Sequence, residues 1–531
     1  MRVLWAALAL TAAAAARPGE APGLAAIGPR SIAARVRFLS SEVLEGRGTG
    51  TRGLSVAEAY VAAEMLTVGL EPAGEAGTFL QAVPLRAWRV DQGAASLSLA
   101  GPGHAPLELL RGEDFVALCD GENSEVEVDA PLVLAGYGIS APEFGYDDLR
   151  SADLRGKIAV VLDGAPLSDR QNYFPPAAHA VYGDRTDKIR RLSERGAAGV
   201  LFVFGTEAEE GMPWGTFARK AREEGMGWLE GTRLGSRAGG APARAVLSRS
   251  GFEKLLAAAA VPGGARAVLE KSEAGRLFSQ VLALRARLRS SAEMREFTSH
   301  NVVGLLRGDG AGAGEVVVVS AHLDHSDPAG DGDPGSAGDN AAGVSVLLEV
   351  AKAFAALSRA PRRSVLFLGV TGAEQGLVGS QFFVRHPPLP RERLVAELNI
   401  DRAPTASPFL NAVAFGAADS TLGGAASAGA AAVGVELSPD PDPRSDGLAR
   451  SDQYSFVLAG IPSLFVAPGR RGADPEDRKK GTARDGALDW ESLARFARLQ
   501  FSIGLAIADG AERPSWNAGD FLERVARRAA P

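Results

Sequence analysis

The sequence predicts an α/β protein whose mostly parallel sheet is flanked by helices on both faces. The first observation is a pair of predominantly apolar stretches, 315–320 and 364–370. The second is the apolar stretch 340–357 between them, which is long enough for a helix that crosses from one parallel strand to the next. Strands that are apolar at every residue are buried on both faces, as in parallel sheets covered by helices. A further strand is expected at 395–400.

A smaller β-rich domain is expected as an insertion ahead of this region. Apolar strands at 130–138, 156–162 and 196–203 occur with a helical stretch at 186–194, and such alternation is typical of a small α/β unit. The expected division of the chain is a signal peptide at 1–16, an amino-terminal helical segment at 17–120 that packs on the main domain, the insert at 121–290, the main domain at 291–520 and a tail at 521–531.

Composition indicates an ordinary globular protein and excludes some classes of function. The chain has 531 residues, of which 46% are hydrophobic and 23% charged, so it can form two or three domains with large cores. Its net charge of −7 gives no electrostatic footprint for nucleic acid. Cys119 is the only cysteine, which excludes an internal disulfide and a thiolate zinc site.

The first residues are typical of a secretory signal peptide. Arg2 is followed by an apolar run over 3–16 that ends in three alanines, the order of features that export signals share. A membrane-spanning helix needs roughly twenty apolar residues, so this run is too short to be an anchor. We therefore expect a periplasmic or secreted protein without a membrane span.

Polar side chains that can bind a metal follow the predicted strands. His322 and Asp324 follow the first strand, Asp339 precedes the long helix, Glu374 follows the second strand, and Asp401 follows the third. The carboxyl ends of parallel strands meet at one edge of a sheet, and imidazole with carboxylates is a ligand set suited to zinc. Asp324 is placed to accept the second ring N–H of His322.

Each of these residues alone has a simpler explanation. Asp339 could be a helix N-cap, Glu374 could be a solvated loop residue, and a His-x-Asp sequence at a strand end is usually a polar loop. The four strand-end positions in one sheet favour a metal site over these separate explanations.

In order along the chain, these residues lie in a series of motifs that resembles the co-catalytic zinc aminopeptidases, peptidase family M28, which include bacterial leucyl aminopeptidases and relatives of glutamate carboxypeptidase. The motifs are LEGR at 44–47, GLEP at 69–72, NVVG at 301–304, AHLD at 321–324, GDNAAGV at 338–344, EQGLVGS at 374–380, NID at 399–401, SDQY at 451–454 and GIP at 460–462. The insert resembles a protease-associated domain through YDD at 146–148 and LRGKI at 154–158.

The resemblance implies a zinc exopeptidase fold, a peptide substrate and a role for each matched residue. His322 and Asp401 would hold one zinc ion, Asp339 would bridge two ions, and Glu374 would hold the second. In the family, a zinc-activated water attacks the scissile carbonyl and a glutamate takes its proton. The implied reaction is hydrolysis at the free amino terminus of a peptide.

Two positions depart from the family pattern. The family has two adjacent glutamates, a general base and then a ligand, and Ala373 stands at the first of these positions. Its last ligand is a histidine where this chain has Gln453, whose amide oxygen is a weaker zinc ligand. The last of the six histidines is His386, so no later histidine replaces the missing ligand.

Four interpretations follow from these residues. The first is a dinuclear aminopeptidase that uses Gln453 as a ligand and another residue as the base. The second is an enzyme that keeps one zinc ion on His322, Asp339 and Asp401. In the second case Glu374 is free to act as the base, and three protein ligands plus water is a normal catalytic zinc arrangement. A third interpretation is a pseudo-peptidase that binds metal or peptide with little turnover. The fourth is a purely structural cluster, although buried carboxylates without a cation repel one another.

Overall fold

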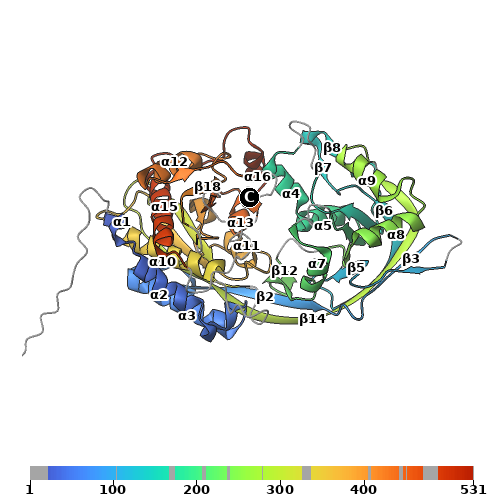
Figure 1. Ribbon diagram of the computed structural model, residues 1–531, viewed down its shortest axis with the longest axis horizontal. Coiled ribbons are helices and arrows are strands. Elements are labelled where there is room, and N and C mark those ends of the chain that lie inside the picture. The colour runs from blue at the N-terminus through green and yellow to red at the C-terminus, as the bar shows by residue number, and fades with distance from the viewer. Residues whose placement is uncertain are drawn as a thin grey trace, which may run out of the picture.

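The protein consists of two halves that lie side by side and share long strands. The computed structural model describes residues 22–102, 105–166, 174–205, 211–235, 240–277, 279–325, 337–404, 408–441, 447–449, 451–469 and 488–529. The 27-residue strand β14 (Gln280–Leu306) runs along the base of both halves (Figure 1). The predicted signal peptide lies outside the described residues. Within them, no helix combines the length and apolar character needed to cross a membrane.

Four parallel strands form the centre of what we call the main half. Their spatial order is β16 (Ser364–Val370), β15 (Val316–His322), β17 (Leu394–Asn399) and β20 (Ser463–Pro468). The last part of β14 pairs antiparallel with β16, and β18 (Asn411–Phe415) pairs antiparallel with β20. The outer strands are β19 (Glu436–Leu437), β1 (Glu71–Pro72), β2 (Leu80–Val90), β11 (Gly225–Glu230) and β12 (Arg233–Leu234). This mixed sheet with a parallel centre confirms the α/β prediction at the level of the main half.

Helices cover both faces of this sheet. Every residue of β15, β16 and β17 is buried, so both faces of these strands need apolar partners. The helices on one face are α1 (Pro22–Ala26), α2 (Pro29–Leu39), α3 (Arg52–Val68), α10 (Ala342–Ala355), α12 (Leu422–Ala432) and α15 (Trp490–Asp509). The other face is covered by α11 (Val378–Arg385) and α13 (Gln453–Leu458).

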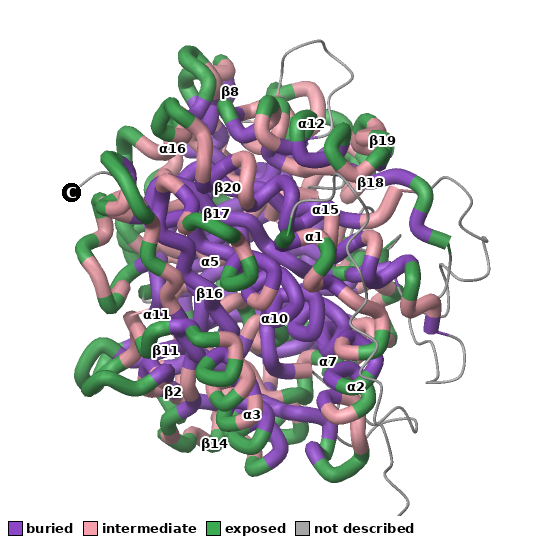
Figure 2. Tube along the Cα trace, turned by 90° about the vertical axis from the view of Figure 1, so that its left-hand side faces the viewer, coloured by how far each residue is buried: buried purple, intermediate pink, exposed green. Residues whose placement is uncertain are grey.

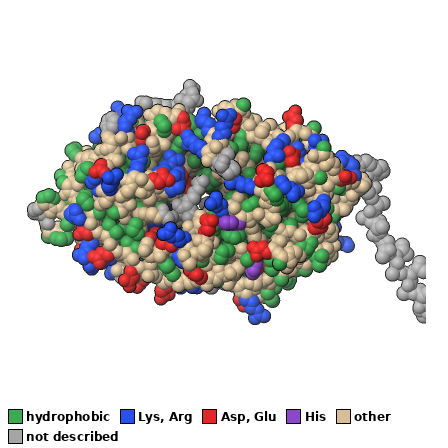
Figure 3. Space-filling model, turned by 180° about the vertical axis from the view of Figure 1, so that it is seen from behind, with side chains coloured by type: hydrophobic (Ala, Val, Ile, Leu, Met, Phe, Trp, Pro, Cys, Tyr) green, Lys and Arg blue, Asp and Glu red, His purple; other side chains and the backbone are tan. Residues whose placement is uncertain are grey.

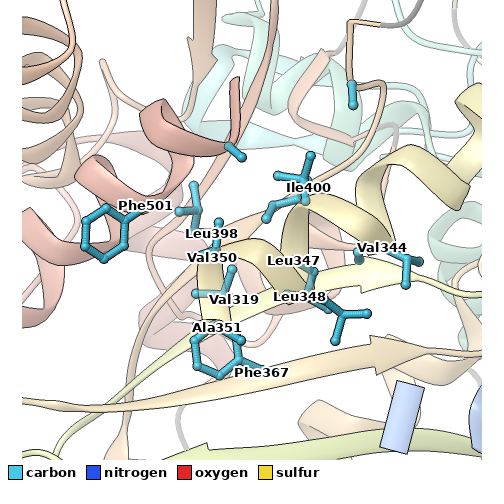
Figure 4. Packing of buried hydrophobic residues seen from close by; sticks show 14 of the residues in the cluster. Val319, Val344, Leu347, Leu348, Val350, Ala351, Phe367, Leu398, Ile400 and Phe501 are labelled. Carbon is cyan, nitrogen blue, oxygen red and sulfur yellow. The ribbon is translucent and has the colours of Figure 1, made fainter. Parts of the chain in front are cut away.

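The centre of the main half is the packing of α10 against three strands. Figure 4 shows Leu347 of α10 and Phe501 of α15 close to Val319 of β15 and Leu398 of β17. Full burial of one such side chain contributes about 1.5–3 kcal/mol. In Figure 2, α10 lies at the middle of the buried region. This rigid centre fixes the strand ends that carry the candidate ligands.

The insert half has a second sheet with its own helices. Its spatial order is β3 (Ser96–Ala100), the first part of β14, β6 (Glu125–Leu134), β9 (Ile158–Leu162), β10 (Gly199–Val203), β13 (Ala243–Leu247) and β5 (Phe115–Leu118). Its helices are α4 (Pro176–Gly183), α5 (Arg185–Glu194), α7 (Trp214–Lys220), α8 (Arg249–Ala258) and α9 (Gly264–Glu273). Short strands β4 (Leu107–Glu108), β7 (Ser140–Ala141) and β8 (Tyr146–Asp147) complete it.

The insert half is not a separate domain in this structure. Strands β2 and β14 run from one half into the other, and the residues of the larger insert core continue into the main half. Tyr454, Trp516 and Phe521 belong to that core although they are distant in sequence. The resemblance of this half to a protease-associated domain stays a prediction.

Two segments differ from the sequence-based division. The expected helical segment 17–120 is helical only to Val68 and continues as β2, β3 and β5, because Val83, Leu85 and Ala87 point into a core on alternate residues. The expected tail contains α16 (Phe521–Ala529), whose Leu522 is buried between the two halves and packs with α13 and α4. Figure 3 shows basic and acidic side chains interspersed over the rear face of the molecule.

Candidate metal centre

His322 and Asp401 meet because their strands are parallel neighbours. Ser320 of β15 lies opposite Asn399 of β17, so the residues two positions further along both strands reach the same sheet edge. The His322 Nε2 atom lies 3.6 Å from Asp401 Oδ1 and 3.3 Å from Asp339 Oδ1. The structure therefore brings together the three residues that the sequence assigned to the first zinc ion.

These distances fit a zinc ion bound by three protein ligands. Two ligand atoms about 2.0–2.1 Å from a tetrahedral zinc lie roughly 3.3 Å apart, close to the two separations at His322 Nε2. All three ligand atoms lie within 4.8 Å of one another. The side chains of His322 and Asp401 are 5% and 10% exposed, whereas that of Asp339 is 50% exposed. The group is thus mostly buried, and Asp339 is its most exposed member.

The orientation of the His322 ring is set by a main-chain carbonyl. Its Nδ1–H donates to the carbonyl oxygen of Asp324 at 3.1 Å, which leaves Nε2 directed at the carboxylates. The sequence predicted Asp324 as the partner of this ring, and its carboxylate Oδ1 lies 4.0 Å from Nδ1. Asp324 thus orients the ring through its backbone, and its carboxylate is engaged elsewhere.

Attraction between the His322 ring and the carboxylates of Asp339 and Asp401 dominates the ionisation of these three residues. Burial alone would lower the pKa of His322, but hydrogen bonds from its ring to Asp339 and Asp401 raise it well above the ordinary value. Burial would likewise raise the pKa of both carboxyls, and His322 instead holds the pKa of each below the usual range. Since a zinc ligand must be a neutral imidazole, metal binding here displaces a proton.

The Asp324 carboxylate holds the loop that carries Glu374. It accepts hydrogen bonds from the backbone N–H groups of Ala373 at 3.1 Å and Glu374 at 3.2 Å. The Thr49 hydroxyl lies 3.1 Å from Asp324 Oδ2 and 2.7 Å from Gln375 Oε1. The amino-terminal segment therefore reaches the site and fixes two loops in relation to each other.

Arg47, in the same amino-terminal segment, supports the loop after β15. Its buried Nε donates to the carbonyl of Leu323 at 3.0 Å, and its own carbonyl accepts from the His325 backbone N–H at 3.3 Å. Burial lowers the pKa of Arg47 to about 10, although Asp324 and Asp339 oppose this shift. The guanidinium stays charged at neutral pH and offsets part of the negative charge of the site.

A second group of ligand atoms adjoins the first. His325, Asp339 and Glu374 place one ligand atom each within 4.8 Å of one another. Partial burial, followed by repulsion from Asp339, raises the pKa of Glu374 to about 7 although the residue is exposed overall. The sequence reasoning gave His325 no role. Its position three residues after His322 in the same loop was the available signal.

Gln453 and Ala373 occupy the positions that depart from the family pattern. Gln453 is buried at the start of α13, where its Oε1 accepts from Asn399 Nδ2 at 2.7 Å and its Nε2 donates to the Leu448 carbonyl at 2.8 Å. Its predicted role as a weak ligand stays a prediction. Ala373 contributes its backbone N–H to Asp324, and its methyl side chain supplies no base.

Comparison with known families agrees with this geometry. Residues 301–503 match the family model described as Peptidase family M28. This segment is therefore similar to peptidase family M28. The matched segment contains His322, Asp339, Glu374 and Asp401.

Two curated relatives match this chain over short stretches. A probable zinc metalloprotease of Pyricularia oryzae is 40% identical over 88 residues, which is 16% of this chain and 17% of that protein. A probable glutamate carboxypeptidase of Arthroderma benhamiae is 36% identical over 107 residues, which is 19% of this chain and 14% of that protein. The chain therefore spans less than a fifth of the length of each of these relatives.

A solved structure resembles this chain across both the main half and the insert half. An aminopeptidase from Aneurinibacillus sp. strain AM-1 covers 93% of this chain and 97% of its own length, with a TM-score of 0.54 and 18% sequence identity. At this identity the likeness shows a shared fold across both halves.

Proposed function

We propose that the protein is an exported zinc aminopeptidase that binds one catalytic zinc ion on His322, Asp339 and Asp401. The observation that supports it most is the 3.3 and 3.6 Å spacing around His322 Nε2 inside the segment that is similar to peptidase family M28. Three protein ligands with an open side is the arrangement of catalytic zinc sites. Asp339, the most exposed of the three, marks the side from which a peptide would enter.

Bound zinc would polarise the scissile carbonyl and lower the pKa of water into the neutral range. The chain itself must then orient the ligands and accept a proton. The Asp324 carbonyl holds His322 in the required tautomer, and the Asp324 carboxylate holds the backbone of Glu374. Glu374 is the only acidic residue between Glu349 and Glu392, so we assign proton acceptance to it.

A pseudo-peptidase is the second candidate, and Ala373 is the observation that favours it. Without a base at the usual position, turnover depends wholly on Glu374. Loss of a positioned base typically costs about 10²–10⁴-fold in rate. A protein of this second kind would bind zinc and peptide with almost no hydrolysis.

The deciding experiment is hydrolysis of an aminoacyl-anilide panel by the mature protein loaded with one equivalent of zinc. We expect hydrolysis in the natural protein and a fall of about 10²–10⁴-fold in Glu374→Gln with the zinc still bound. His322→Ala should lose both zinc and activity, which identifies the ligand. Full activity in Glu374→Gln would contradict its role as base, and no activity in the natural protein with zinc bound would indicate a pseudo-peptidase.

A further inference from the structure

A pocket of about 610 Å³, which we call the junction pocket, lies where the insert half meets the main half. Its wall is formed by α4 of the insert half and by β18, α13 and α16 of the main half. Helices α4 and α16 are neighbours across the junction (Figure 1). The volume is in the range of sites that bind small molecules, and such sites often form between two structural units.

The junction pocket is separate from the candidate metal centre. Its described lining residues do not include any of the candidate metal ligands. Phe415, at the end of β18, pairs antiparallel with Phe465 near the start of β20. Strand β20 runs parallel to β17, and Asp401 follows the carboxyl end of β17. The end of β18 therefore lies toward the sheet edge opposite to the metal centre.

Most of the wall of the junction pocket is apolar. Apolar side chains from both halves line it: Ala180, Val181, Phe415, Leu448, Val457 and Phe521. The Phe415 ring is itself stacked on Phe465, with the ring centroids 5.4 Å apart, so this part of the wall is held in place by packing. Such a wall favours a ligand with an apolar body, which leaves water on binding.

Two carboxylates, those of Asp419 and Asp520, also line the junction pocket. Asp520 Oδ1 accepts from the Leu522 backbone N–H at 2.8 Å, at the start of α16. Neither carboxylate has an ion pair within the part of the chain that the structure describes. Burial, followed by repulsion from Asp520, raises the pKa of Asp419 to about 6. A ligand with a positive charge would relieve this repulsion.

Arg524 is the basic residue among the described lining residues, and it lies against aromatic rings. Its guanidinium carbon is 5.8 Å from the centroid of the Phe521 ring and 6.0 Å from that of Phe144. At these distances the cation is attracted to the ring faces. The negative charge of Asp419 and Asp520 is therefore left for a ligand.

We propose that the junction pocket binds an organic ammonium ion with an apolar aryl or alkyl body, whose ammonium group lies at Asp419 and Asp520. A free amino acid fits less well, because its own carboxylate would meet the two aspartates. A bare metal ion would leave the apolar wall in contact with water. The inference goes beyond the proposed function, because this site holds no candidate metal ligand and requires no hydrolysis.

The test compares three probes that share one apolar body. Calorimetric titration of the zinc-loaded protein with 4-phenylbutylammonium should give a Kd of about 1 mM or tighter. The neutral 4-phenylbutanol and the anionic 4-phenylbutyrate should bind about tenfold more weakly or less, because they cannot donate a charged hydrogen bond to the carboxylates. Equal affinity for all three would overturn the proposal. Binding of the ammonium ion that disappears when zinc is loaded would also overturn it, because the probe would then lie at the metal centre.

Variants of the two aspartates locate the ammonium group. Asp419→Asn and Asp520→Asn should each weaken binding of the ammonium ion about tenfold and leave binding of the alcohol unchanged. Both should fold, because asparagine still caps a helix at position 520 and the first change removes a repulsion. An unchanged Tm without probe checks this.

Glu113→Gln is the matched control, because it removes the same charge from an exposed position of the insert half that does not line the pocket. It should keep the affinity of the natural protein for the ammonium ion. Equal weakening in this control would assign the effect to net charge and overturn the site. Unchanged affinity in both aspartate variants would overturn it as well. None of these measurements uses hydrolysis, so a failure of the proposed function leaves their outcome decisive.

Discussion

Both halves of the protein place charged side chains at the carboxyl ends of parallel strands, but they neutralise them differently. After β9 in the insert half, Asp163 accepts from Arg185 Nε at 2.9 Å, and Lys188 donates to the Leu162 carbonyl at 2.8 Å. In the main half, His322 and Arg47 face the carboxylates of the ligand groups. The insert cluster thus contains its own cations, whereas the main-half cluster has an excess of carboxylates.

The ionisation of the two clusters reflects this difference. Burial would raise the pKa of Asp163, yet the Arg185 guanidinium lowers it below the ordinary value. At the main-half edge, partial burial and then Asp339 raise the pKa of Glu374 to about 7. A cluster that satisfies its own charges is structural, and a cluster with excess carboxylate is stabilised by a bound cation.

Removing one carboxylate should destabilise the insert cluster and leave the main-half cluster no less stable, and this is the largest expected contrast. Asp163→Asn leaves Arg185 and Lys188 without their counter-charge, so we expect a loss of about 3–5 kcal/mol in the free energy of unfolding. Glu374→Gln in metal-free protein at pH 8 should not destabilise, because the folded state disfavours ionised Glu374. Urea unfolding without metal measures both, and equal losses would contradict the comparison.

Restoring a base beside Glu374 should raise activity by the next largest amount. Ala373→Glu adds a second carboxylate to the loop while its backbone N–H still donates to Asp324. We expect kcat to rise about 10²-fold. Ala373→Gln is the matched control of the same size without charge. An equal rise in that control would show that volume, and not proton transfer, limits the rate.

Much of the main half follows directly from its apolar sequence. The predicted strand 364–370 agrees with β16 at both ends, and the predicted helix 340–357 contains α10. Both were predictable because buried strands and helices consist mostly of apolar residues. Strand β2 was missed since its inward residues alternate with Arg86 and Trp88, and no neighbouring helix marks it. The helix α16 was missed since its polar face predominates and its partners are distant in sequence.

The candidate site also has a part that the sequence predicts and a part that it does not. The strand-end position of His322 and Asp401 is a local property that the sequence shows, and the structure brings the two side chains together. The approach of His325 to Asp339 and Glu374 could not be predicted, because it depends on how the loop after β15 lies against two segments that are distant in sequence. The engagement of Gln453 with Asn399 depends on the packing of α13 against β17, which no local pattern reveals.

The insert-half cluster of Asp163, Arg185 and Lys188 should also make the stability of the protein depend on pH. Burial lowers the pKa of Lys188 to about 8, against an ordinary value of 10.5. Between these values the folded protein has lost the proton and the unfolded chain still holds it, so stability rises with pH by up to about 1.4 kcal/mol per unit. Lys188→Met should remove this contribution. The measurement is urea unfolding from pH 7.5 to 10.5, and parallel profiles for both proteins would contradict the prediction.

The smallest expected effect concerns Thr49, which links the amino-terminal segment to the loops that carry Asp324 and Glu374. Its buried hydroxyl lies within hydrogen-bond distance of Asp324 and Gln375. Thr49→Val should therefore remove about one hydrogen bond that holds the loop of Glu374 in place. That bond is worth about 1 kcal/mol, and the expected fall in kcat is therefore about fivefold with zinc content unchanged.

Thr51→Val is the matched control for Thr49→Val, because the Thr51 hydroxyl caps α3 by accepting from the Leu54 N–H and donates to the Gly48 carbonyl, within its own segment. Loss of this cap should cost about 1 kcal/mol of stability and leave kcat unchanged. If both variants lower kcat equally, the effect is general loosening of the amino-terminal segment. If only Thr49→Val does, this segment positions the loop of Glu374, and the excess carboxylate of the main half is then held in place for catalysis by residues far away in sequence.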